Sequence, residues 1–236
     1  MKLSRLQPGH IWSSENGMTS LLIFTLGYLF VVCALSELSF GDLVADLMFS
    51  LIIVAGVLTT FTQRWVRVFA IGLAVATLAL TWQQQIHLVE SLAILNTILR
   101  VIFLGFLLAV LFVQVFQAGA VTAHRIRGAI VIYLLLGGLW SLLYHLVALT
   151  IPHSFHLPGG LAVSDPQALG RVLTYFSFTT LTTTGFGDIT PIRPLTRTLA
   201  MFEALAGQLY LVITMARLVS QAIVCRDEKI RNKSRD

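Results

Sequence analysis

Residues 182–188 read Thr-Thr-Thr-Gly-Phe-Gly-Asp, and the interpretation of the C-terminal half of the chain depends on this stretch. Glycine stands at alternate positions, 185 and 187. Glycine adopts left-handed backbone angles without the steric cost that other residues meet. The threonines and the Asp-x-x-Pro exit at Asp188 and Pro191 frame the two glycines. Alone, such a stretch is compatible with an ordinary turn, so its meaning depends on the segments around it.

A short helix is expected directly before this stretch. Asp165 can cap free amides at a helix N-terminus, and Pro166 suits the first helical position. A helix over residues 166–182 would be about 25 Å long at roughly 1.5 Å per residue. It is apolar enough to enter a membrane but too short to cross and emerge. We therefore expect a re-entrant segment.

Six apolar segments of membrane-spanning length make up most of the remaining chain. About 20 apolar residues are needed to cross about 30 Å of hydrocarbon. Hydrophobic residues are 56% of the chain and charged residues only 11%, whereas soluble domains carry roughly 25% charged residues. We expect an all-α integral membrane protein. The six segments are residues 18–35, 43–61, 66–82, 92–116, 128–151 and 195–224.

Basic and acidic connections alternate between these segments, beginning with Lys2 and Arg5 and ending with the basic residues of 225–236. Under the positive-inside rule this alternation places both termini in the cytoplasm of a cell membrane. The net charge of +5 then needs no nucleic-acid partner. The basic tail could bind anionic lipid head groups, although the positive-inside bias explains it equally.

Residues 182–188 resemble the selectivity filter of the tetrameric potassium channels, whose usual form is Thr-Val-Gly-Tyr-Gly-Asp. Thr183 matches the filter threonine, and Thr184 and Phe186 replace valine and tyrosine. In this family backbone carbonyls replace the hydration shell of the ion, so K⁺ is the permeant ion and no cofactor is implied. The resemblance implies ion binding at Thr183, Thr184, Gly185, Phe186 and Gly187, with K⁺ held at the first four.

The filter departs from the family pattern behind the strand. The glutamate that the family usually carries in its pore helix is replaced by Thr179, so a buried carboxyl partner for Asp188 is missing. Tyr175 is placed to donate to Asp188 instead. Asp188, Tyr175 and Thr179 are therefore the expected filter support. Each chain has one filter and the family's pore takes four, so the expected partners are three identical subunits of a homotetramer.

The last apolar segment resembles the family's inner helix in bacterial six-helix members, through Gly-Gln-Leu-Tyr-Leu at 207–211 and Ala-Arg-Leu-Val at 216–219. Gly207 stands where the family places a hinge, and simple helix packing is an equal alternative. Leu211, Met215 and Val219 share one helical face. They could form a hydrophobic gate or ordinary core.

The resemblance implies a domain layout. Residues 1–17 form a cytoplasmic segment, 18–127 a peripheral four-helix domain similar to a voltage sensor, 128–224 the pore domain, and 225–236 the basic tail. The pore domain divides into an outer helix (128–151), a turret (152–165), a pore helix (166–182), the filter (183–188) and an inner helix (195–224).

Arg100 is the only arginine in residues 91–116, where a voltage sensor would carry several. One charge crossing 100 mV is worth only about 2.3 kcal/mol, so we expect weak or absent voltage dependence. Arg100 is either a remnant of a sensor or half of a static buried pair. Its candidate partners are Glu37, Asp42 and Asp46.

The expected function is passive conduction of K⁺. The alternatives are a non-selective cation channel with a loosened filter, a non-conducting signalling or scaffold subunit, and a subunit of a potassium-uptake transporter. His153 and His156 could sense protons or bind a metal across subunits, or be plain surface. An enzyme is not expected, because no nucleophile–base pair, metal site or phosphate loop is recognisable and Glu203 stands isolated in the sequence.

Overall fold

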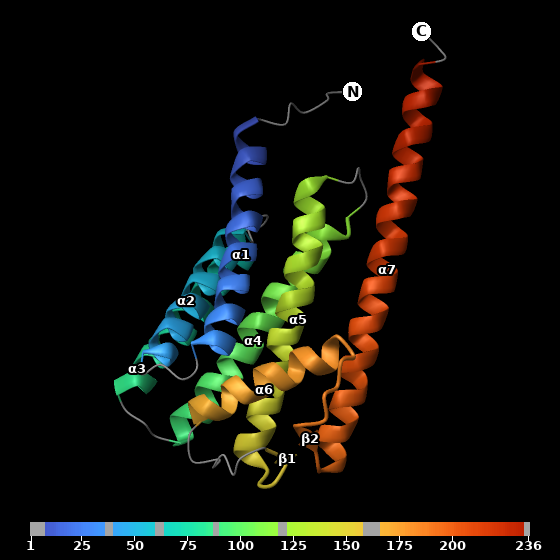
Figure 1. The fold of residues 1–236 in the computed structure, drawn as a ribbon. Helices are drawn as coiled ribbons and strands as arrows, with labels where there is room; N and C mark the ends of the chain where they lie inside the picture. The colour runs from blue at the N-terminus through green and yellow to red at the C-terminus, as the bar shows by residue number, and fades with distance from the viewer. Residues whose placement is uncertain are drawn as a thin grey trace. The chain divides into compact units, whose positions relative to one another are not determined.

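The computed structural model describes residues 8–35, 40–59, 64–86, 90–117, 122–157 and 166–233. These residues form helices and two short strands (Figure 1). Six of the helices are long and apolar enough to cross a bilayer, which confirms the expected all-α integral membrane fold. The helices are α1 (Pro8–Ala34), α2 (Gly41–Thr59), α3 (Arg64–Ile86), α4 (Glu90–Val115), α5 (Ala123–Thr150), α6 (Pro166–Leu181) and α7 (Pro194–Lys233).

The chain forms two compact units, residues 1–111 and 112–236. The division falls inside α4, earlier than the boundary expected after residue 127. The reason lies at Phe116, just beyond the end of α4. Its carbonyl accepts a hydrogen bond from the Arg217 guanidinium, and its ring meets Tyr210 edge-on at 6.3 Å between centroids. Both partners belong to α7, so the end of α4 packs with the C-terminal unit.

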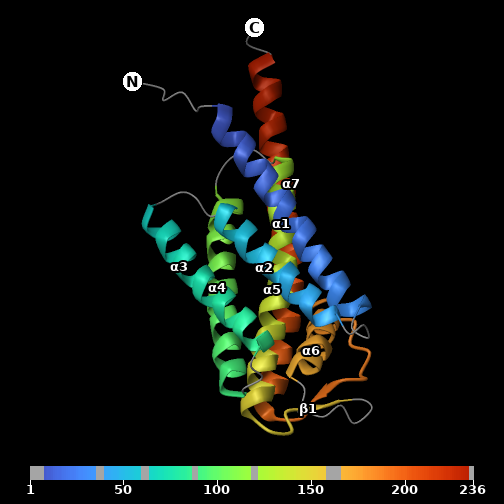
Figure 2. The same cartoon turned by 90° about the vertical axis from the view of Figure 1, so that its left-hand side faces the viewer.

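In the N-terminal unit α1 and α2 lie side by side (Figure 2). Phe103, Leu104 and Leu107 of α4 are buried there, together with Ile53 of α2. Gly56 of α2 leaves room for the Leu107 side chain, because a Cβ at that position would lie 2.8 Å from a Leu107 methyl. A small residue thus lets a long side chain of α4 pack against α2, and small residues are common where membrane helices meet.

In the C-terminal unit the short helix α6 packs against both α5 and α7 (Figure 1). Tyr144 of α5 meets the rings of Phe155 and Phe176 edge-on, at 5.7 and 5.1 Å between centroids. Aromatic pairs favour this geometry. The three rings belong to one buried cluster that fixes α6 on α5. Its other members are Ala148, Leu169, Leu173 and Ile189.

Strand β1 (Phe155–His156) pairs antiparallel with β2 (Thr190–Pro191). The Ile192 amide adds a hydrogen bond to the Ser154 carbonyl at 2.9 Å. The expected turret begins at residue 152, and this pairing ties its first part to residues 190–191. Residues 158–165, which include the expected cap Asp165, lie outside the described residues.

α1 and α7 extend furthest beyond the expected apolar spans. α1 begins at Pro8 and α7 continues to Lys233, whereas the expected segments begin at residue 18 and end at 224. For α7 the reason is that residues 225–233 contain no glycine or proline, so nothing interrupts the helix where the apolar stretch ends. α6 ends at Leu181, one residue before the expected end.

Candidate functional site

The extended segment over residues 183–188, called the strand below, follows α6 and has left-handed backbone angles at every second residue from 183 to 187. Thr183, Gly185 and Gly187 have φ of +58°, +53° and +81°. The two glycines are those that the sequence predicts. Thr183 is an addition, since a β-branched residue rarely adopts a positive φ and does so only where its surroundings impose it. Its amide donates to the Thr180 carbonyl at 2.9 Å, which helps to hold that conformation.

The amides of the strand point back at α6. Both Thr184 N and Gly185 N donate to the Thr179 carbonyl, at 2.8 and 3.1 Å. In a trans peptide the carbonyl points opposite to the amide of the following residue. The carbonyls of Thr183 and Thr184 therefore point away from α6. The result is a row of backbone oxygens on one side, of the kind that can replace water around a dehydrated cation.

Gln208 of α7 also contacts this strand, and the sequence did not predict that contact. Its Nε2 donates to the Thr183 hydroxyl oxygen at 3.0 Å. The Thr182 and Thr184 hydroxyls lie 2.9 Å apart. The sequence held no local signal for this contact, because Gln208 and Thr183 are 25 residues apart.

The support behind the strand combines a ring, a carboxylate and a backbone carbonyl. The Tyr175 ring lies parallel to that of Phe186, with centroids 6.4 Å apart. Desolvation, followed by a hydrogen bond with Asp188 and the charge of that carboxylate, raises the pKa of Tyr175. The Thr179 hydroxyl donates to the Phe176 carbonyl at 2.9 Å. Thr179 therefore reaches the strand through its own carbonyl and not through its side chain.

For the channel that the sequence predicts, we expect Tyr175→Phe to reduce single-channel conductance or to speed inactivation, because it removes the hydroxyl and keeps the ring on Phe186. Since the pKa of Tyr175 is raised, its neutral form is favoured. The contribution of the bond is thus complete below about pH 10, the ordinary value, and is lost as pH rises beyond it. Single-channel recording of both proteins at neutral pH tests this. Identical conductance and inactivation would show that the bond does not matter.

Gly207 lies against the C-terminal end of α6. A Cβ at this position would lie 2.2 Å from the Leu181 carbonyl oxygen. The Tyr133 hydroxyl of α5 also donates to that oxygen, at 3.4 Å. Close packing therefore accounts for the glycine. A hinge at Gly207 stays a prediction.

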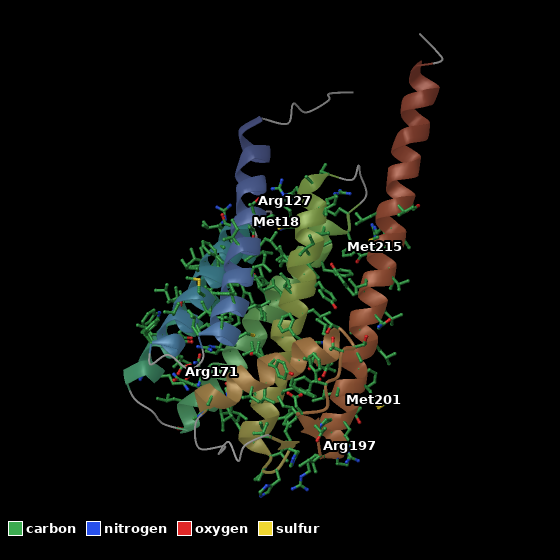
Figure 3. All side chains as sticks on the ribbon, in the orientation of Figure 1. Met18, Arg127, Arg171, Arg197, Met201 and Met215 are labelled. Atoms are coloured by element: carbon green, nitrogen blue, oxygen red, sulfur yellow. The ribbon has the colours of Figure 1, made fainter. Side chains whose placement is uncertain are left out.

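The three other inner-helix residues of interest lie on exposed parts of α7. Leu211, Met215 and Val219 are 47%, 63% and 54% exposed. Figure 3 labels Met215 on α7, with Met201 nearer the N-terminal end of that helix. Only 11% of the apolar span of α7 is buried, against 22–33% for the other five spans. The face of α7 that carries these three residues is exposed within a single chain. Its role as a gate stays a prediction.

Glu203 is not isolated, contrary to the sequence-based interpretation. Its side chain is 0% exposed. Its Oε2 accepts from the Tyr144 hydroxyl at 2.6 Å, and its Oε1 lies 2.5 Å from the Ser177 hydroxyl oxygen. Those partners are 59 and 26 residues away in sequence. No local pattern could have revealed them.

Arg100 pairs with Asp46, one of its three expected partners, at 2.7 Å. Its guanidinium also donates to the Thr81 hydroxyl at 3.1 Å and lies over the Phe49 ring. Thr81 in turn donates to Asn96 at 3.2 Å. Asp46 is the partner that the structure supplies, and Glu37 lies outside the described residues. The arrangement is a partly buried pair within a polar network.

We expect Arg100→Gln to leave the slope of the conductance–voltage relation unchanged, because one paired charge per chain supplies little gating energy. The variant should instead lower thermal stability, since it leaves Asp46 without its cation in a partly buried site. Currents recorded over a range of voltages, with a thermal melt of the same preparation, test both parts. Steep voltage gating that disappears in Arg100→Gln would contradict this reading.

His153 and His156 are both exposed. Within the part of the chain that the structure describes, no group of three or more His, Cys, Asp or Glu is placed to hold a metal ion. The side chains of residues 221–236, which include the basic tail, lie outside the described ones.

Residues 170–223 match the model of a protein family described as ion channel. The match covers most of α6, the strand with alternating φ and the apolar part of α7, and it leaves the larger part of the chain unmatched. No curated protein and no solved structure shows significant similarity to the chain. The match supports ion-channel activity in a multi-pass membrane protein.

Proposed function

We propose that the chain is one subunit of a potassium-selective channel, which passes K⁺ passively through a pore on the axis of four identical chains. The observation that carries the proposal is the alternation of left-handed residues at Thr183, Gly185 and Gly187. It occurs beside a half-length helix, in the segment that matches the ion-channel family. The proposed protein uses no cofactor and catalyses no reaction.

K⁺ would be bound by oxygens of the strand. The carbonyls of Thr183, Thr184, Gly185 and Phe186 supply the rings that replace water around the ion, and Gly187 completes the strand. The Thr183 hydroxyl adds the innermost ring. α6 ends at Leu181, directly before the strand. A helix C-terminus carries partial negative charge, so four such ends favour a cation below the filter.

The strand requires more than one copy around the ion, and the family that it resembles builds its pore from four. One strand offers oxygens from one side only, and a dehydrated ion needs them all round. The poorly buried face of α7 supplies apolar surface for contacts between copies. We propose a homotetramer in a cell membrane with both termini in the cytoplasm.

Planar-bilayer recording of the purified full chain, with K⁺ and Na⁺ on opposite sides, tests the proposal. A reversal potential that follows the K⁺ gradient supports it. A reversal potential near zero indicates the non-selective cation channel instead. Ion flux that is absent from liposomes containing folded protein indicates a non-conducting signalling or scaffold subunit. Native mass spectrometry of the same sample should give four copies.

A further inference from the structure

Glu203 brings three helices of the C-terminal unit together behind the filter. The carboxyl group belongs to α7, Tyr144 to α5 and Ser177 to α6, and the Ser177 hydroxyl oxygen also lies 2.8 Å from the Gly137 carbonyl of α5. All three side chains are buried, with exposed fractions of 0% each. The proposed conduction pathway does not itself use this group.

Counting protons at Ser177 shows the state of the carboxyl group. A serine hydroxyl has one proton and can donate one hydrogen bond. The Gly137 carbonyl can only accept, so the Ser177 proton is directed to it. The contact of 2.5 Å between Ser177 Oγ and Glu203 Oε1 then needs a proton from Glu203, since two oxygens without a hydrogen between them repel at that distance. Tyr144 donates to the other carboxyl oxygen, which remains an acceptor.

The surroundings of Glu203 favour the same state. The titratable groups that face it are Tyr144 and Tyr133, both on α5. α6 contributes the neutral Ser177. Among the described residues, no lysine, arginine or histidine pairs with the carboxyl group. A buried carboxylate without a cation is strongly disfavoured, and such a group normally takes up a proton.

We propose that Glu203 is a positioning residue for the filter and works as a neutral carboxylic acid that holds α6 between α5 and α7. Gly207, one helical turn after Glu203, contacts the carbonyl of Leu181 at the end of α6. The acid therefore fixes the helix whose last turn supports the filter strand. When Glu203 loses its proton, the single Ser177 proton can bond either Glu203 or Gly137 but not both. One of the two hydrogen bonds is then lost, and α6 is held less tightly.

The protonation state can be measured without any current. A protonated carboxylic acid has a carbonyl stretch at higher frequency than a carboxylate. We expect the infrared spectrum of the full chain at neutral pH, in a detergent free of ester groups, to contain such a band, and Glu203→Gln to lack it. A wild-type spectrum without this band, or a band of equal size in the variant, overturns the proposal.

The positioning role, which rests on the proposed function, is tested by the K⁺/Na⁺ permeability ratio. Glu203→Gln keeps a donor for Ser177 and an acceptor for Tyr144, so it should retain the wild-type ratio. Glu203→Ala should lower the ratio about tenfold, the order of effect of a lost hydrogen bond in a protein. Tyr144→Phe should also lower the permeability ratio. This variant keeps its ring in the aromatic cluster, so it provides a folded protein for the test if Glu203→Ala does not fold.

The two measurements separate the two hypotheses. If the K⁺/Na⁺ permeability ratio falls as much in Glu203→Gln as in Tyr144→Phe, the positioning role is overturned. The glutamine amide can still bond both Ser177 and Tyr144, so this variant should retain the ratio. A wild-type channel that does not select K⁺ contradicts the proposed function, while the infrared band still decides whether Glu203 carries a proton.

Discussion

Gly207→Ala should abolish K⁺ flux and destabilise the C-terminal unit. The added Cβ would lie 2.2 Å from the Leu181 carbonyl oxygen and 3.1 Å from its carbonyl carbon. These are backbone atoms at the end of α6, which cannot rotate away as a side chain would. Overpacking of a buried site costs about 1–3 kcal/mol and occasionally more, and the immobile partner puts this case at the upper end. The displaced α6 would carry the filter strand with it.

Gly105→Ala in α4 is the matched control for this prediction. Gly105 is also in the middle of a helix, and a Cβ there has nothing within 4 Å. Alanine is favoured over glycine in a helix by about 1 kcal/mol, so the control should be as stable as the wild type or more stable. Thermal melts in detergent and K⁺ flux into liposomes measure both variants. Gly207→Ala with wild-type melting temperature and flux would show that α7 does not approach α6 so closely.

Features that arise from neighbouring residues could be predicted from the sequence. Asp165 and Pro166 led to a helix over 166–182, and α6 spans Pro166–Leu181. The alternation of Gly185 and Gly187 led to left-handed angles at both. In each case the physical cause is local. The length of an apolar stretch, the fixed φ of proline and the freedom of glycine act within a few residues.

Features that arise from distant partners could not be predicted. Glu203 carries the same signal in the sequence as any lone acid in an apolar helix, and only the fold brings Tyr144 and Ser177 to it. Arg100 is an intermediate case. A buried arginine requires an acid, so three candidates followed from the sequence, but the choice of Asp46 depends on how α2 and α4 pack.

Thr183 shows a third kind of limit, in which surroundings override a local preference. Threonine is disfavoured at positive φ, so no sequence rule assigns it there. The amides of residues 183–185 all donate to carbonyls of the last turns of α6, and Gln208 fixes the Thr183 hydroxyl. These hydrogen bonds together stabilise the positive φ of Thr183, which its β-branched side chain disfavours.

Gly185→Ala should remove K⁺ selectivity while the chain remains folded. Gly185 has φ of +53°, and a Cβ there would have nothing within 4 Å. The substitution therefore strains the backbone without a clash. A left-handed L-residue costs roughly 1–2 kcal/mol, and the cost recurs in each of the four strands of the proposed pore. Rotation of the peptide relieves the strain and turns a carbonyl away from the ion, so the K⁺/Na⁺ permeability ratio should fall at least about tenfold.

D-Alanine at the same position, introduced by semisynthesis, is the matched control. Its mirror-image Cα favours positive φ, so it adds the same methyl group without the strain that L-alanine brings. We expect the D-alanine protein to retain K⁺ selectivity and the L-alanine protein to lose it, at equal thermal stability. Equal loss in both would mean that the methyl group itself disturbs the pore. Equal retention in both would mean that the left-handed angle at residue 185 is not needed to direct the carbonyls, and the cation site inferred from that angle would have to be abandoned.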